Sequence, residues 1–161
     1  MKATVYALVD ELHQICELKN ITISTAESCT GGLVSSNITE KSGVSSWFLG
    51  GVVSYANQCK QNILKVSAEN LDTFGAVSEP VALQMAQGAN RVTGSDFSVA
   101  LTGIAGPEGG SIDKPVGTVW IAWAKHNQAK AECFLFEGDR NAVREQAVMQ
   151  ALKGLIKIIK K

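Results

Sequence analysis

Short apolar runs that suit β-strands alternate with helix-like segments along this chain, and that alternation limits its possible folds more than any other feature. Apolar residues recur at helical spacing over 5–16 and again over 81–92. Strands separated by helices are typical of α/β domains, in which helices cover the sheet. The strand-like runs fall at 21–25, 50–55, 96–103, 117–124 and 131–138.

The length of 161 residues suits one domain spanning 1–161, with enough chain to bury an apolar core. We predict a single three-layer α/β/α domain with a mixed sheet flanked by helices. The runs at 50–55 and 96–103 predict buried strands, and the last two runs predict a hairpin. Ser78 suits the N-cap of a helix whose first turn contains Pro80.

Two glycine-rich turns each follow a strand-like run. "TAESCTGG", 25–32, follows the first run, and "TGIAGPEGG", 102–110, follows "FSVAL". Glycine lets backbone N–H groups converge on an anion without interference from a Cβ atom. The first turn is equally suited to start a helix. The second turn matches neither a Walker A loop nor G-x-G-x-x-G, and it is equally suited to form a plain loop. If the two strands are parallel, both turns lie at the carboxyl edge of the sheet, where α/β folds bind ligands.

The charge balance and the cysteine pattern argue against several classes of protein. Fifteen basic residues balance fifteen acidic ones, whereas a dedicated nucleic-acid-binding protein usually has a basic excess. A hydrophobic content of 45% argues against disorder. We expect no signal peptide and no membrane span. The four cysteines form no C-x-x-C pair, which favours free thiols in the cytoplasm over a disulfide framework or a zinc site.

A serine nucleophile is available in "SGVSSWFLGGVVSYANQCK", 42–60, which contains Ser45, Tyr55 and Lys60. A serine needs a base, and neither of the two histidines lies near a glycine-rich turn. Lysine is the remaining base, with the tyrosine as a relay. The lysine has to be neutral, so its pKa must lie well below about 10.4, which requires burial or a nearby cation such as Arg140. Their spacing alone favours structural roles for all three side chains.

Cys29 is the rival nucleophile. It lies near an expected helix N-terminus, and a helix N-terminus lowers the pKa of a thiol. A buried cysteine that serves packing is the more common outcome. The sequence by itself leaves both interpretations open.

Self-association is a further expectation. Small α/β enzymes often form two-fold homodimers. The apolar hairpin with Trp120 and Trp123, or the long last helix, offers a self-complementary patch.

Six motifs occur in the order seen in the CinA C-terminal domain family, and the chain resembles that family from about Leu8 to its last helix. The motifs are "TAESCTGG", "GGVVSYANQCK", "GAVSEPVA", "TGIAGPEGG", "KPVGTVWIA" and "FEGDR". The resemblance implies hydrolysis of the carboxamide of nicotinamide mononucleotide, which yields nicotinic acid mononucleotide and ammonia in pyridine-nucleotide salvage. It implies neither a metal nor a cofactor.

The resemblance also implies catalytic roles for a serine, a tyrosine and a lysine, and the spacing of the family falls on Ser45, Tyr55 and Lys60. Ser45 would attack the amide carbon, Lys60 would take the proton, and Tyr55 would relay or hold it. Ser28 is kept as a substrate contact or an alternative nucleophile. The glycine-rich turns would offer N–H groups to the phosphate or to the oxyanion. The expected substrate contacts are Ser28, Thr30, Gly31, Gly32, Thr102, Gly103, Gly106 and Arg140.

Two other functions fit the same motifs. One is a non-catalytic module that binds a nucleotide through the glycine-rich turns. The other is an interaction domain linked to competence or DNA damage, as the family name suggests. The intact serine, tyrosine and lysine set favours the enzyme, and the balanced charge weakens direct DNA binding.

Overall fold

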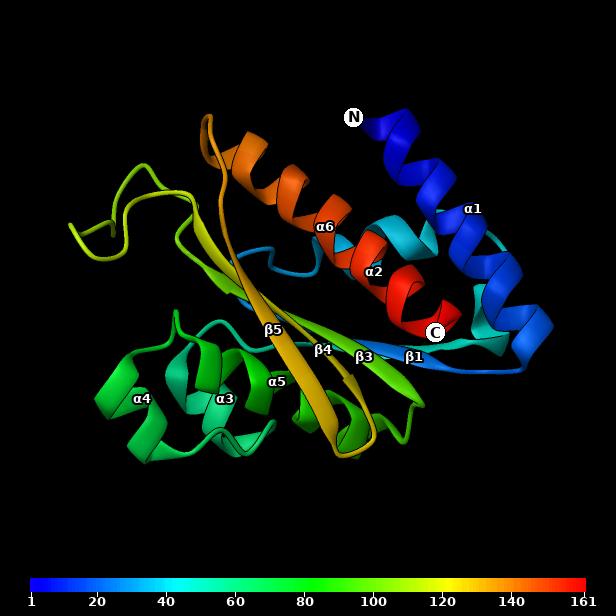
Figure 1. The fold of residues 1–161 in the computed structure, drawn as a ribbon, viewed down its shortest axis with the longest axis horizontal. Coiled ribbons are helices and arrows are strands. Elements are labelled where there is room, and N and C mark those ends of the chain that lie inside the picture. Colours follow the sequence, from blue (N-terminus) through cyan, green and yellow to red (C-terminus); the bar gives the residue numbers. More distant parts are fainter.

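A single sheet forms the middle of three layers in the computed structural model, which describes residues 1–161 (Figure 1). Its strands are β1 (Ile23–Glu27), β2 (Phe48–Val53), β3 (Phe97–Gly103), β4 (Thr118–Lys125) and β5 (Gln128–Leu135). They lie in the order β2–β1–β3–β4–β5. The first three strands run parallel, while β4 is antiparallel to β3 and pairs with β5 as a hairpin. The predicted mixed sheet and its hairpin are therefore confirmed.

Helices pack on both faces of this sheet, as predicted (Figure 1). One face is covered by α1 (Lys2–Lys19), α2 (Leu33–Thr39) and α6 (Arg140–Lys160). The other face is covered by α3 (Asn57–Asn62), α4 (Ala68–Phe74) and α5 (Glu79–Thr93). A 3-10 turn, η1 (Val44–Ser46), precedes β2. Each face has its own cluster of buried apolar side chains.

Burial distinguishes the central strands from the edge. All of β1 and nearly all of β3 are buried, which confirms the prediction for 96–103. The prediction of a buried strand at 50–55 is wrong. That strand begins at Phe48, and half-buried and exposed residues alternate along it, because β2 lies at the edge of the sheet with a neighbour on one side only.

Polar residues precede α4, α5 and α6. The Asp139 carboxylate accepts a backbone N–H from the first turn of α6 (2.9 Å). Ser78 holds the N-cap position of α5, but its hydroxyl donates to Gly75 O (2.7 Å) instead of capping the helix. The sequence did not predict α4, which begins after Ser67, whose hydroxyl accepts from Asn70 N (3.1 Å).

The parallel pairing of β1, β2 and β3 decides which turns meet. Ser28 follows β1, Ser54 follows β2, and Ile104 follows β3, so all three lie at the carboxyl edge. β4 is antiparallel to β3 and β5 is antiparallel to β4, so β5 ends at the same edge as β3, and α6 begins there. The opposite edge carries η1 and the turn between β4 and β5.

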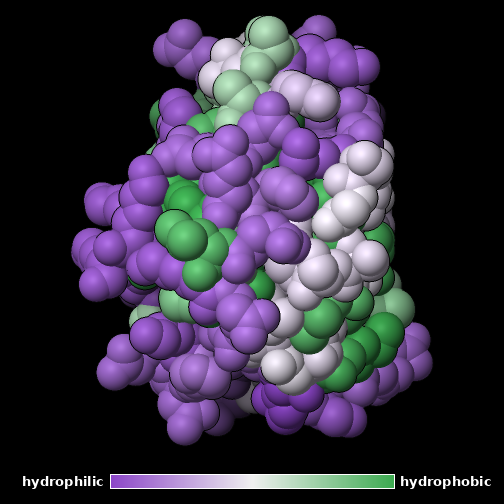
Figure 2. Space-filling view, turned by 90° about the vertical axis from the view of Figure 1, so that its right-hand side faces the viewer, coloured by the Kyte–Doolittle hydropathy of each residue, from purple (hydrophilic) through white to green (hydrophobic).

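The side of the molecule that lies to the right in Figure 1 is mainly hydrophilic (Figure 2). A band of apolar and weakly polar surface runs down the right of that view, on the side where β2 forms the edge of the sheet. None of the helices combines the length and the apolar character needed to cross a bilayer.

Candidate active site

Ser28 lies directly after β1, on the turn that leads into α2. Its N–H donates to Leu101 O of β3 (3.0 Å), which ties the turn to the neighbouring strand. The Glu27 carboxylate is fully buried beneath the start of α2. Because it accepts N–H groups that the first helical turn leaves unpaired, Glu27 caps α2 and fixes the path of the turn. Its four donors are Thr30 Oγ1 (2.7 Å), Val34 N (2.9 Å), Ser35 N (3.1 Å) and Ser35 Oγ (2.8 Å).

The Lys60 amine lies beside the Ser28 hydroxyl. Lys60 is 1% exposed, and its Nζ is 2.9 Å from Ser28 Oγ. Two backbone carbonyls also accept from Nζ, Ser54 O at 2.7 Å and Tyr55 O at 3.1 Å. Burial deprives the ammonium form of water and lowers the pKa of Lys60 from its ordinary value. In its neutral form the amine would donate to both carbonyls and face Ser28 Oγ with its lone pair, the geometry that a nucleophile and its base require.

This pair opens into a cavity of about 220 Å³ at the carboxyl edge of the sheet. Thr102 and Gly103 reach it from the end of β3, and Ala105 from the second glycine-rich turn. Arg140, the first residue of α6, lies on its rim. The fold thus brings both glycine-rich turns and the serine–lysine pair to one cavity.

The structure does not bring Ser45 to this cavity. Ser45 is exposed in η1, before β2, whereas Lys60 contacts the residues that follow β2. The six residues of β2 separate the two ends of the strand by about 20 Å. The structure therefore does not place Ser45 beside Lys60, and Ser28 is the serine that contacts the lysine.

Tyr55 meets Lys60 only through its backbone. Its carbonyl accepts from Nζ, while its side chain is 64% exposed at the mouth of the cavity. No hydrogen bond joins the phenol to Ser28 or Lys60, so a proton relay through Tyr55 is not formed in this structure.

Four of the predicted contact residues shape the turns and do not line the cavity. The Thr30 hydroxyl donates to Glu27, as described above. Gly31 and Gly32 have φ angles of +58° and +99°, which glycine adopts without strain where the turn enters α2. Gly106 O accepts from Arg140 Nη1 (2.9 Å).

Cys29 also lines the cavity, but its surroundings do not activate it. Burial raises the pKa of the Cys29 thiol to about 11, so the thiolate is scarce at neutral pH. Neither histidine is placed to act as the base for Ser28. His13 Nδ1 accepts from the Trp47 indole (2.8 Å), and His126 lies in the turn at the edge of the sheet opposite the cavity. Lys60 is the only base that contacts Ser28.

Arg144, which the sequence did not single out, lies behind the first glycine-rich turn. Its Nε donates to Cys29 O (3.2 Å) and its Nη2 to Thr30 O (2.9 Å), so α6 holds the first glycine-rich turn. The signal available in the sequence was its spacing from Arg140, because residues four apart lie on one face of a helix. Ser54 Oγ is buried without a partner, and nothing in the structure explains it.

Nowhere in the fold do three or more His, Cys, Asp or Glu side chains gather as a metal-binding group.

The fold is an α/β domain in which a buried lysine contacts a serine where the parallel strands end. Comparison with known proteins supplies the family. The model of the CinA C-terminal domain matches residues 5–159, and the chain belongs to this family.

The relatives include both short and long proteins. The chain is 46% identical over 151 residues to nicotinamide-nucleotide amidohydrolase PncC of Escherichia coli K12, covering 92% of this chain and 90% of the relative. It is 48% identical over 163 residues to a CinA-like protein of Fervidobacterium nodosum, but spans only 40% of that protein's length. A crystal structure of competence/damage inducible protein CihA from Agrobacterium tumefaciens superposes with a TM-score of 0.94 at 39% identity, covering 98% of this chain and 96% of the other.

Proposed function

We propose that the protein hydrolyses the carboxamide of nicotinamide mononucleotide to nicotinic acid mononucleotide and ammonia. The observation that carries the proposal is the 2.9 Å contact between Lys60 Nζ and Ser28 Oγ. It supplies a base to a serine within a cavity at the ligand-binding edge of an α/β sheet. Similarity to PncC of Escherichia coli along nearly the whole of both chains supports this choice of substrate.

The reaction begins when Ser28 Oγ attacks the amide carbon as its proton passes to Lys60 Nζ. The carbonyls of Ser54 and Tyr55 stabilise the ammonium that forms, because each accepts one of its N–H groups. The tetrahedral intermediate collapses when Lys60 returns the proton to the amide nitrogen, which leaves as ammonia. Water then attacks the acyl-serine with Lys60 again as the base, and nicotinic acid mononucleotide is released.

The shape of the site suits a substrate in two parts. The cavity of about 220 Å³ has room for the pyridine carboxamide but not for the whole nucleotide. A second, open hollow of about 550 Å³ shares Ala105 and Arg140 with it. Arg140 is the only cation other than Lys60 that lines either space. We assign the ribose phosphate to the second hollow, beside the Arg140 guanidinium.

The proposal is tested by incubating the purified protein with nicotinamide mononucleotide. We expect equal amounts of ammonia and nicotinic acid mononucleotide, and no release from the Ser28→Ala variant measured beside it. Binding of the nucleotide by calorimetry without any release would instead indicate the non-catalytic nucleotide-binding module.

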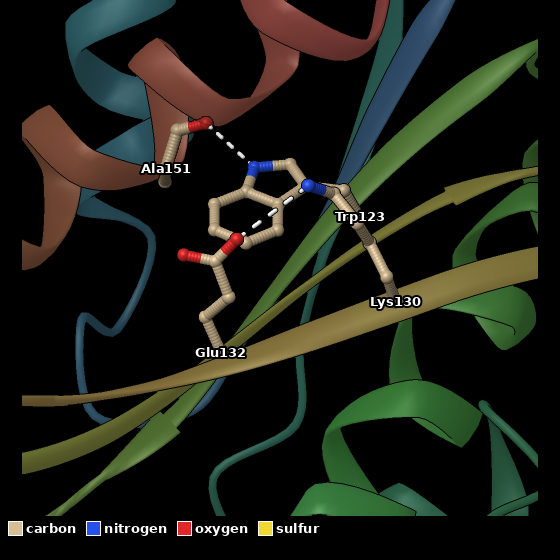
Figure 3. A network of polar contacts seen from close by, with 4 residues as sticks. All are labelled: Trp123, Lys130, Glu132 and Ala151. Atoms are coloured by element: carbon tan, nitrogen blue, oxygen red, sulfur yellow. Dashed lines mark hydrogen bonds and ion pairs between the residues drawn. The ribbon is translucent and has the colours of Figure 1, made fainter.

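We also propose that the protein is a two-fold homodimer, through β2 and not through the predicted hairpin patch. Trp123 is 3% exposed, its indole donates to Ala151 O of α6 (2.9 Å), and Lys130 covers its ring (Figure 3). That tryptophan belongs to the core and offers no surface to a partner. Most apolar residues of α6 are likewise buried, against the sheet and α1.

The edge strand β2 is better suited to a partner. No charged residue occurs from Ser42 to Cys59, and Leu49 and Val53 are exposed on β2. Free edges normally carry charges or proline that prevent pairing. Two β2 strands related by a two-fold axis would pair antiparallel without placing like charges opposite each other.

Light scattering at micromolar concentration is expected to give the mass of a dimer, and Leu49→Lys is expected to give a monomer, because a lysine would be placed at the paired edge. The matched control is Leu18→Lys, which adds the same charge at an 87% exposed position on α1 and should stay dimeric. A wild-type monomer would refute the proposal, and so would a Leu49→Lys dimer.

A further inference from the structure

We propose that Arg144 is a positioning residue for an oxyanion site formed by the backbone N–H groups of Cys29 and Ala105. The inference rests on the proposed amide hydrolysis. Attack by Ser28 on the amide carbon places a negative charge on the amide oxygen. Preorganised N–H donors at that oxygen lower the barrier, and losing one donor costs about 10²–10³ in rate.

The N–H of the nucleophile itself is not available for this task, because Ser28 N–H donates to Leu101 O (3.0 Å). When a nucleophile stands on a strand-to-helix turn, the donors come from the residue after it and from a second loop. Here the residue after the nucleophile is Cys29, and the second glycine-rich turn contributes Ala105. Both residues line the cavity with Ser28.

Neither of these two N–H groups donates to another residue, and the Cys29 N–H meets only its own thiol. Cys29 is 7% exposed and Ala105 is 4% exposed, yet neither N–H makes a hydrogen bond to another residue. Buried N–H groups without a partner are rare, since each costs the loss of its bond to water. Two of them in the cavity of a serine–lysine pair point to an acceptor that arrives with the substrate.

Arg144 holds the first of these donors in place from behind. The Ser28 carbonyl accepts from Gly31 N (3.0 Å), which fixes the peptide that carries the Cys29 N–H. The next two carbonyls, of Cys29 and Thr30, are both bound by the Arg144 guanidinium. Its planar fork fixes two neighbouring peptides at once, which a lysine ammonium does not do.

The peptide that carries the second donor is fixed by Gly117 N, which donates to Ile104 O (2.8 Å), and α6 holds the segment that follows it. Arg140, one turn before Arg144 on α6, donates to Gly106 O (2.9 Å), in the residue after Ala105. The start of α6 thus holds both glycine-rich turns through their carbonyls. Arg144 does not line the reaction cavity and borders a separate hollow between α1, α2 and α6. It should therefore affect the transition state without contacting the substrate.

The test compares the steady-state kinetics of Arg144→Met and Arg144→Lys with the wild type. We expect kcat of Arg144→Met to fall about 100-fold while KM changes by less than about threefold, since an interaction used only in the transition state is lost. Arg144→Lys should lie between the two, and the acidic limb of the pH profile should not move in either. The matched control is Arg91→Met, which removes a similar bond to a backbone carbonyl, Leu64 O (2.7 Å), and should keep the wild-type kcat.

A second readout does not depend on turnover. A small fluorophosphonate that labels Ser28 also develops an oxyanion, so its labelling rate should fall by a similar factor in Arg144→Met. An unchanged kcat, or a raised KM with kcat unchanged, would overturn the inference. If Arg144→Met fails to fold, the kinetic and the labelling measurements are both made on Arg144→Lys. A wild type that releases no ammonia but labels faster than the variants would refute the proposed function and leave the oxyanion site standing.

Discussion

Ser28→Ala is expected to lower the deamidation rate by a factor on the order of 10⁴ or more, whereas Ser45→Ala stays within about twofold of the wild type. The reason is the position of each hydroxyl. Ser28 Oγ lies 2.9 Å from a buried amine, while Ser45 lies exposed before β2, at the opposite edge of the sheet. Alanine at position 28 removes the atom that forms the acyl-enzyme.

The measurement is ammonia release under saturating nicotinamide mononucleotide, with melting temperatures recorded for both variants. Ser45→Ala is the matched control, because it makes the same chemical change to a serine of the same chain. An active Ser28→Ala together with an inactive Ser45→Ala would return the nucleophile to Ser45. It would also mean that the carboxyl-edge cavity is not where the reaction occurs.

Lys60→Met and Lys60→Arg are both expected to lose about 10³ in kcat, the usual range for removing a general base. Methionine has no lone pair that accepts the proton, and a guanidinium does not deprotonate near neutral pH. Both variants should still bind nicotinamide mononucleotide by calorimetry, since Arg140 and the turns remain. A Lys60→Arg variant with wild-type kcat would make residue 60 a positioning cation and would remove it as the base.

The pH dependence separates the base from a structural lysine. Only the neutral amine accepts the proton, so activity should rise with pH as Lys60 deprotonates. Burial lowers its pKa, which moves that acidic limb below the ordinary range of a lysine.

The same pKa shift affects stability. At pH values between the lowered and the ordinary pKa of Lys60, the unfolded chain binds more protons than the folded one. The wild type should therefore gain stability relative to Lys60→Met as pH rises through that window, in denaturant titrations at several pH values. A flat difference would contradict the burial of the titrating amine.

Much of the architecture was predictable from local pattern. Apolar runs of strand length, an amphipathic first helix and a polar hairpin turn each follow from short-range preferences that the tertiary structure respected. Two elements are exceptions. The short helix α4 has only one buried apolar residue, Leu71, so no stripe marks it. β2 contains as many apolar residues as a buried strand, yet it lies at the edge of the sheet. Its position in the sheet cannot be predicted from its own sequence.

The sequence by itself determined that the chain is an α/β domain of the CinA C-terminal family, and it predicted Lys60 and two glycine-rich turns as parts of the site. Only the tertiary structure decided which serine meets the lysine. Ser45 lies closer to Lys60 along the chain than Ser28 does. However, β2 lies between Ser45 and Lys60 in the sequence, so the two residues lie at opposite edges of the sheet. Parallel pairing of β1 with β2 instead puts the residues after both strands side by side, which joins Ser28 to Lys60. The pKa of that lysine is likewise a tertiary property, because the groups that exclude water from it come from other strands and turns.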